Sequence, residues 1–341
     1  MKHFKPFFKA AALLLSAMFA TNAAAYDFYV GDIGYNVVDW GSVEVAETYE
    51  GYYGDVVIPS TVTVEESHYY ETYEMTYTVV GIGERAFCDC SITSVTLPNT
   101  ISYINEYAFY NCSNLQEITI PDNVCFLGSY AFGYCTGLTS ITLPNSVTEL
   151  GWNTFYCCTG LTSVELSSSL YELPGTFFGC TGLTSVEIPA SVEYLDETFK
   201  NCSNLTSVVI PSTLDGLGSN SFYGCDKLMT ITCEAVNPPA CSDLQSFPES
   251  VYNLAKLYVP SASIPSYSNA NVWKKFVNIF GIGEEVIEGD IDGDGVMTIG
   301  DLSNLIDLLL ANDNSNPKAD VDGDGEMTIA DVAALIDMLL N

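Results

Sequence analysis

Apolar residues recur along the middle of the chain with a fixed period. Phenylalanines and cysteines both repeat at steps of mostly 22 or 23 residues, at Phe87, Phe109, Phe132, Phe155, Phe178, Phe199 and Phe222 and at Cys90, Cys112, Cys135, Cys158, Cys180, Cys202 and Cys225. A period of about 20 to 50 residues is typical of stacked repeat architectures. We therefore divide residues 81–233 into seven repeat units.

Each unit contains the pattern Leu-x-x-Leu-x-Leu, as at Leu138, Ile141 and Leu143. Its last three positions alternate apolar, polar and apolar, which predicts a short β-strand with one side chain facing outward. A second apolar pair, such as Val147 and Leu150, follows a proline and should close the other side of the coil. Stacking then buries apolar surface that one unit cannot bury alone.

The segment AFGYCTGLTSITLPNSV, residues 131–147, closely resembles the BspA-type leucine-rich repeats of bacterial surface and secreted proteins. The resemblance recurs in every unit. It implies a leucine-rich-repeat solenoid that serves as a protein-binding or adhesion scaffold, and some family members bind host matrix proteins. It implies no active site.

The segments on either side of the repeats are expected to cap them. Residues 26–80 are rich in Tyr, Val and Thr with apolar and polar residues in alternation, which predicts β-strands. Residues 234–283 contain a strand-like segment, 254–259, and the aromatic residues Trp273, Phe276 and Phe280. The predicted fold class is α+β but mainly β, with a capped solenoid and a small all-α domain at the end.

Twelve cysteines would ordinarily suggest disulfides in an exported protein. Seven equivalent cysteines in one ladder cannot all pair, so we expect buried thiols there. Cys233 and Cys241 could close a loop bridge. A zinc site is disfavoured because His68 is the single histidine beyond residue 25 and no pair of Cys-x-x-Cys motifs is present.

The first 25 residues have the pattern of a secretory signal. Three lysines precede an apolar run over residues 10–20, and Ala23, Ala24 and Ala25 offer a cleavage site. The run falls short of the roughly 20 residues that span a bilayer, and no later membrane span is predicted. We expect a bacterial protein that is secreted or displayed at the cell surface.

The charge is strongly negative. Ten Lys and Arg against 43 Asp and Glu give a formal net charge of −33. A nucleic acid needs clustered basic residues, so it is excluded as a partner, whereas cations are attracted. Calcium is the first ligand to consider.

Two acidic segments thirty residues apart carry the candidate metal chemistry within residues 284–341. Each is an EF-hand-type loop whose positions 1, 3, 5, 7, 9 and 12 should ligate one of two calcium ions; these are Asp290, Asp292, Asp294, Val296, Thr298 and Asp301, and Asp320, Asp322, Asp324, Glu326, Thr328 and Asp331. An apolar helix should follow each loop, over residues 302–310 and 332–340.

A duplicated loop and helix with Asp at position 12 resembles the type I dockerin module. The resemblance implies that a cohesin partner reads loop positions 10 and 11, here Ile299 and Gly300, and Ile329 and Ala330. Symmetric halves would allow two binding orientations. The alternative is a calcium-folded cap without a docking partner.

The outward strand positions are the candidate ligand contacts of the repeats: Thr119, Thr142, Glu165, Glu187 and Thr232. No segment offers two carboxylates across a sugar cleft, so we expect no enzyme. The leading hypothesis is a secreted or cell-surface adhesion scaffold that binds a protein ligand, with a tail for attachment. The alternative is a non-catalytic component of a polysaccharide-degrading complex, docked through cohesin.

Overall fold

The computed structural model describes residues 26–48, 51–68, 71–241, 245–283, 289–292, 296–312 and 316–340. The predicted signal segment, residues 1–25, lies outside these ranges. Contacts divide the chain after Leu183 into two compact units, each of which we describe by itself. None of the helices in the described ranges combines the length and apolarity that crossing a membrane requires.

The first unit begins with a β-sheet. Strands β1 (Phe28–Val30), β2 (Ile33–Asp39) and β3 (Ser42–Val45) form an antiparallel meander. Strand β6 (Glu71–Ile82) runs parallel to β3 and pairs antiparallel with β5 (Thr61–His68). Because β6 also pairs with the first short strand of the coils, the sheet leads directly into the repeats.

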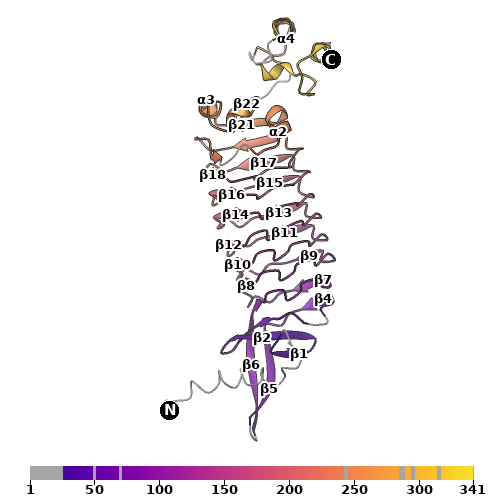
Figure 1. The fold of residues 1–341 in the computed structure, drawn as a ribbon, viewed down its shortest axis with the longest axis vertical. Coiled ribbons are helices and arrows are strands. Elements are labelled where there is room, and N and C mark those ends of the chain that lie inside the picture. Colours follow the sequence, from indigo (N-terminus) through magenta and orange to yellow (C-terminus); the bar gives the residue numbers. More distant parts are fainter. Residues whose placement is uncertain are drawn as a thin grey trace. The chain divides into compact units, whose positions relative to one another are not determined.

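The coils of the first unit carry two rows of short strands, one at the left and one at the right of the stacked coils in Figure 1. One row contains β4 (Tyr53–Val57), β7 (Ser91–Thr96), β9 (Glu117–Ile118), β11 (Ser140–Thr142) and β13 (Ser163–Glu165). The other contains β8 (Tyr103–Ile104), β10 (Phe126–Leu127), β12 (Glu149–Leu150) and β14 (Glu172–Pro174). Pairing is parallel and one repeat apart, as in Ile141 opposite Val164. The second row corresponds to the second apolar pair of each repeat, and Val147 and Leu150 are buried.

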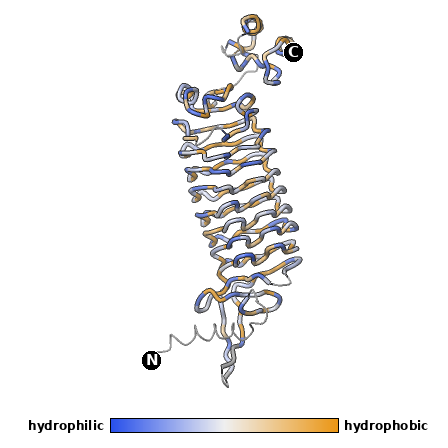
Figure 2. The backbone as a smooth tube through the Cα atoms, viewed as in Figure 1, coloured by the Kyte–Doolittle hydropathy of each residue, from blue (hydrophilic) through white to orange (hydrophobic). Residues whose placement is uncertain are grey.

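A ladder of phenylalanines forms the core of the first unit. Phe87, Phe109, Phe132, Phe155 and Phe177 are fully buried, and successive rings stack with centroids 4.9, 5.1, 5.4 and 5.6 Å apart. Figure 2 shows the apolar segments recurring from coil to coil. The assignment of Phe178 to this ladder is wrong, since Phe178 is half-buried and contacts Tyr156 instead. Phe177 keeps the three-residue spacing to Cys180 that Phe155 has to Cys158.

The ladder cysteines are buried thiols that join neighbouring coils. The Sγ of Cys112 donates to the carbonyl oxygen of Phe87 (2.9 Å), and Cys135 donates in the same way to Phe109 (3.1 Å). No disulfide is found in the described part of the chain, so the bridge that Cys233 and Cys241 could have closed is not formed. The Cys233 Sγ instead accepts a hydrogen bond from the Tyr267 hydroxyl (3.2 Å).

The second unit continues the same architecture. A parallel sheet contains β15 (Ser185–Glu187), β17 (Ser207–Ile210), β19 (Thr230–Cys233), β21 (Lys256–Val259) and β22 (Asn278–Gly281). A second row contains β16 (Tyr194–Asp196), β18 (Gly216–Leu217) and β20 (Ala240–Cys241). The coil therefore runs past the seventh sequence repeat, and Phe247 stacks on Phe222 at 5.1 Å.

An aromatic cluster follows the last coil. Short helices α2 (Glu249–Leu254) and α3 (Ile264–Tyr267) and the 3-10 turns η1 (Ser261–Ser263) and η2 (Trp273–Lys275) lie between the strands. The buried Trp273 ring meets Phe247 and Tyr267 in edge-on contacts at 5.8 and 5.3 Å. Residues 249–254 are helical, so the expected strand over 254–259 starts at Lys256.

A small helical domain ends the second unit. It contains α4 (Ile299–Ala311), the 3-10 turn η3 (Pro317–Ala319) and α5 (Ile329–Leu340). Ile291, Leu305, Ala319 and Leu335 form its buried core. The mainly β solenoid and the helical terminal domain agree with the predicted fold class.

Candidate metal centre and docking surface

The two helices of the terminal domain begin inside the acidic loops. The Thr298 hydroxyl accepts a hydrogen bond from the Gly300 amide (3.0 Å), and Asp301 Oδ2 accepts one from the Thr298 amide (2.7 Å). This is a capping box, which stabilises the first turn of α4. Thr328 and Asp331 make the equivalent bonds at α5. Both helices therefore start three residues before the predicted positions.

The first loop gathers three carboxylates. Oxygens of Asp290, Asp292 and Asp301 lie within 4.8 Å of one another, and Asp290 and Asp301 are buried. Asp301 Oδ1 also accepts hydrogen bonds from the amides of Ile291 (2.7 Å) and Asp292 (3.1 Å). Burial opposes ionisation of Asp301, but these backbone bonds outweigh it and lower its pKa. Asp301 is thus held as a carboxylate that closes the loop.

The second loop gathers Asp320, Asp322 and Asp324, again with oxygens within 4.8 Å of one another. Asp320 Oδ2 accepts a hydrogen bond from the Gly325 amide (3.0 Å), and Gly325 has the positive φ of +88° that the sharp turn requires. Asp320 Oδ1 is buried, and the described residues offer it no hydrogen-bond partner. Burial and the nearby carboxylates of Asp331 and Asp324 raise the pKa of Asp320.

A calcium ion fits this arrangement. Burying a carboxylate oxygen without a partner is costly, and a cation among the converging oxygens would remove that cost. Hard oxygen donors are the ligands that calcium prefers. Asp294 lies outside the described residues, and the ligating roles of all the predicted residues in both loops stay predictions.

Lys318 contacts the first loop and was not found from the sequence. Its ammonium nitrogen lies 3.2 Å from Asp290 Oδ2, and both side chains are largely shielded from solvent. Lys318 comes from η3, immediately before the second loop, so the two loops are joined through an ion pair. The sequence offered one indication of this contact: Lys318 is the single basic residue after Lys275, in an otherwise acidic segment.

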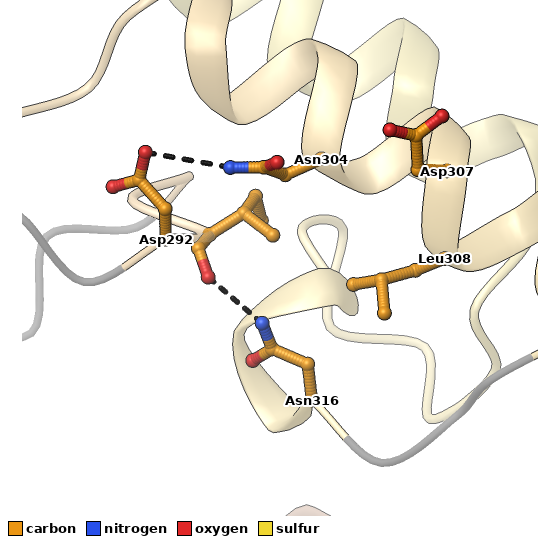
Figure 3. A pocket seen from close by; sticks show the side chains of 6 residues that line it. Asp292, Asn304, Asp307, Leu308 and Asn316 are labelled. Carbon is orange, nitrogen blue, oxygen red and sulfur yellow. Dashed lines mark hydrogen bonds between the residues drawn. The ribbon is translucent and has the colours of Figure 1, made fainter.

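A hollow of about 410 Å³ lies beside the first loop (Figure 3). Two asparagines in its wall fix the loop: Asn304 Nδ2 donates to Asp292 Oδ2 (3.4 Å), and Asn316 Nδ2 donates to the Ile291 carbonyl (2.8 Å). Asp307 and Leu308 complete the wall on α4. These bonds tie the loop to α4 and to the segment before η3.

The two terminal helices expose large aliphatic side chains at equivalent positions. Six such residues form two triplets, which we call the docking stripes: Ile299, Ile306 and Leu310 on α4, and Ile329, Ile336 and Leu340 on α5. Their exposed fractions are 75, 40 and 81% on α4 and 79, 38 and 79% on α5. The spacing i, i+7, i+11 places each triplet on one helix face. Gly300 and Ala330 are exposed as well.

Four of the five candidate contacts of the repeats lie on strands, and Thr119 directly follows β9. Thr119, Thr142 and Glu165 are exposed in the first unit, and the Thr142 hydroxyl donates to Glu165 Oε2 (3.1 Å). In the second unit Glu187 is exposed and Thr232 is half-buried. Their part in ligand binding stays a prediction.

Comparisons with known proteins identify both parts of the chain. The family described as "BspA type Leucine rich repeat region" matches six copies over residues 80–198 and 174–264. The "Dockerin type I domain" matches residues 288–340. No curated protein matches the chain.

Three solved structures illustrate the similarity of the repeats. A leucine-rich repeat protein from Bacteroides ovatus shares 25% identity over 75% of this chain and 76% of its own, with a TM-score of 0.44. The T. pallidum leucine rich repeat protein shares 24% over 60% and 81%, with a TM-score of 0.42. A leucine rich cell surface protein from Faecalibacterium prausnitzii shares 20% over 76% and 95%, with a TM-score of 0.34.

Both matched families are non-catalytic scaffold or docking modules. Leucine-rich repeats mediate protein binding, and type I dockerin domains bind calcium and cohesin partners. Proteins with these modules are typically extracellular or attached to the cell surface. Because the repeat family matches more than half of its residues, the chain belongs to the BspA-type leucine-rich-repeat family, and it ends in a type I dockerin domain.

Proposed function

We propose that this protein is a secreted, non-catalytic adhesion scaffold whose terminal domain attaches it to a cohesin partner when calcium is bound. The observation that carries the proposal is the pair of docking stripes. A terminal domain that only capped the chain would not need aliphatic side chains on the outer faces of both helices.

The energetic gain from covering one docking stripe is substantial. Burying a Leu or Ile side chain contributes about 1.5 to 3 kcal/mol, so the three side chains of one stripe supply the apolar centre of an interface. The stripes lie at equivalent positions of the duplicated halves, which supports two binding orientations of equal strength. At loop position 10 the contact is apolar in both halves, through Ile299 and Ile329.

Calcium is proposed to order the docking stripes through two ions, one in each loop. Clustered carboxylates repel one another, and an ion relieves that repulsion. Asp301 and Asp331 link calcium binding to the helices, because each residue closes its loop and also caps the helix that carries a docking stripe. Loss of the ions should therefore loosen α4 and α5.

The repeats are proposed to bind a protein ligand, with a host matrix protein as the candidate, at the exposed strand positions around Thr142 and Glu165. The double variant Thr142→Lys and Glu165→Lys should lose binding to immobilised matrix proteins without a lower melting temperature. Unchanged binding would reject this face. The dockerin match favours, as a second candidate, a non-catalytic role in a polysaccharide-degrading complex.

The stripes are tested by calorimetry of the full chain with type I cohesin modules in calcium. Leu310→Asp and Leu340→Asp should each leave binding nearly intact, because the other half remains, while the double variant should lose at least a hundredfold in affinity. Ala311→Asp is the matched control, since it adds the same charge about 100° away around α4. Full binding by the double variant would reject the stripes as the docking surface.

A further inference from the structure

The turn that follows the second strand row contains two residues with left-handed backbone in every coil of the first unit. They lie before the buried Phe and before the ladder Cys: Arg85, Tyr107, Tyr130, Asn153 and Gly175, and Asp89, Asn111, Tyr134, Cys157 and Gly179. Gly, Asn and Asp adopt this conformation most readily, and a bulky side chain is strained there. Three tyrosines nevertheless occupy it on two adjacent coils, as Arg85 and Cys157 do on others.

These tyrosines belong to a continuous aromatic surface, which we call the tyrosine ladder: Tyr107, Tyr110, Tyr130, Tyr134 and Tyr156. Tyr107 and Tyr130 stack with centroids 5.3 Å apart and planes within 1°. Tyr134 meets Tyr110 at 5.5 Å and Tyr156 at 5.3 Å, both edge-on. The ladder therefore spans three coils.

The ladder is a surface feature and not part of the core. Tyr134 is 37% exposed and the other four rings are half-buried, whereas the phenylalanine ladder is fully buried. Trp152, whose carbonyl accepts a hydrogen bond from the Tyr130 amide (3.0 Å), is 50% exposed beside it. Tyrosine and tryptophan give large, rigid contact areas with a polar group, and they are enriched in protein interfaces.

The contacts between the rings favour a protein over a sugar. Tyr107 and Tyr130 each cover one face of the other, and each edge-on pair covers a further face, so few open faces remain for a flat sugar ring. Ring edges and hydroxyls suit the side chains of a protein segment.

The charge around the ladder defines the partner further. Residues 26–183 contain nineteen acidic residues and one basic residue, Arg85, which pairs with Glu47 (3.6 Å). Asp89 lies next to the ladder and accepts a hydrogen bond from Asn111 Nδ2 (2.7 Å). The negative field attracts cations, and the tyrosine hydroxyl oxygens can accept hydrogen bonds from guanidinium or ammonium groups.

We propose that the tyrosine ladder binds an arginine- or lysine-rich protein segment. The ladder lies on the turns after β8, β10 and β12, so it is a site separate from the strand positions Thr142 and Glu165. It adds a ligand site to the proposed scaffold and does not depend on cohesin docking.

The test uses the full chain and a fluorescent twelve-residue peptide of alternating Arg and Gly, followed by anisotropy. The triple variant Tyr107→Asn, Tyr130→Asn and Tyr134→Asn should bind the peptide at least tenfold more weakly. Its melting temperature should be nearly unchanged, because asparagine occupies the same left-handed turn positions at Asn111 and Asn153. A peptide with citrulline in place of arginine should bind the unmodified chain at least tenfold more weakly. The matched control is Tyr223→Asn, which removes a 46% exposed tyrosine from the second unit and should bind normally.

Three results would overturn the proposal. Equal binding by the triple variant and the Tyr223→Asn control would mean general attraction to an acidic protein. Equal affinity for the citrulline peptide and the arginine peptide would show that the positive charge does not contribute to binding. Binding of cellohexaose, but not of the peptide, with loss of cellohexaose binding in the triple variant would make the ladder a carbohydrate surface.

A single variant keeps the test decisive if circular dichroism shows that the triple variant does not fold. Tyr134→Asn alone should then lower the affinity for the peptide at least threefold. An unchanged affinity would reject the ladder as the binding site.

Discussion

Phe177 and Phe178 are neighbours in the sequence but differ in their contribution to stability. Phe177 is fully buried and stacks on Phe155 with centroids 5.6 Å apart. Phe178 is half-buried and contacts Tyr156 at 5.0 Å. Replacing each by alanine therefore tests which residue carries the repeat, with the other as its matched control.

The expected costs follow from burial. Removing a buried phenylalanine leaves a cavity and costs about 3 to 5 kcal/mol, so Phe177→Ala should lower the free energy of unfolding by about that amount. Phe178→Ala removes a partly exposed ring and its contact with Tyr156, and an aromatic contact contributes about 0.5 to 1.5 kcal/mol, so its cost should stay below about 2 kcal/mol. The two variants should differ by at least about 1 kcal/mol.

Urea unfolding followed by circular dichroism in calcium measures both values. A repeat array can lose cooperativity when one coil is weakened, so a broader transition is expected for Phe177→Ala. Equal costs, or a larger cost for Phe178→Ala, would refute the assignment of Phe177 to the core ladder.

Other consequences concern charge and reactivity. Lys318→Met should tighten calcium binding at the first loop several-fold by calorimetry, because it removes an ammonium that competes for Asp290; weaker binding would contradict this. Burial raises the pKa of the Cys135 thiol well above its usual range, so in the native chain at pH 8 a disulfide reagent should label the exposed Cys125 and spare Cys135, as mass spectrometry would show. Burial also raises the pKa of Glu44 in the folded state, so the folded state favours the protonated form of this side chain. The free energy of unfolding should therefore fall as the pH rises from the pKa of Glu44 in the unfolded chain to its higher pKa in the folded chain. The variant Glu44→Gln should therefore be more stable than the unmodified chain at pH 7 but not at pH 3. A stability difference between the two proteins that does not change with pH would count against this reasoning.

The repeat and the loops could be predicted from the sequence because each rests on a local pattern that recurs. The spacing from Phe132 to Phe155 gives the coil, and the series of aspartates from Asp320 onward gives the loop. The register failed at the fourth step, where two adjacent phenylalanines fit the period almost equally well. The coil beyond Cys233 was missed because Phe247 follows Phe222 by 25 residues and the leucine pattern fades.

Features that depend on tertiary contacts could not be predicted. The ion pair between Lys318 and Asp290 joins residues 28 positions apart, and no local pattern relates them. The tyrosine ladder depends on left-handed turns, and Tyr130 at such a position runs against backbone preference. The docking stripes were found in part, since Ile299 was identified from loop position 10 while Leu310 at the far end of α4 was not.

Calcium-dependent docking can be measured by calorimetry of the full chain against cohesin modules from the organism that produces it, first in calcium and then in excess chelator. We expect tight binding to at least one cohesin in calcium and loss of that binding in chelator, restored when calcium is returned. Binding that persists in chelator would contradict the role of the ions. Absence of binding to every cohesin, with helicity that still depends on calcium, would leave the terminal domain as a cap and contradict docking.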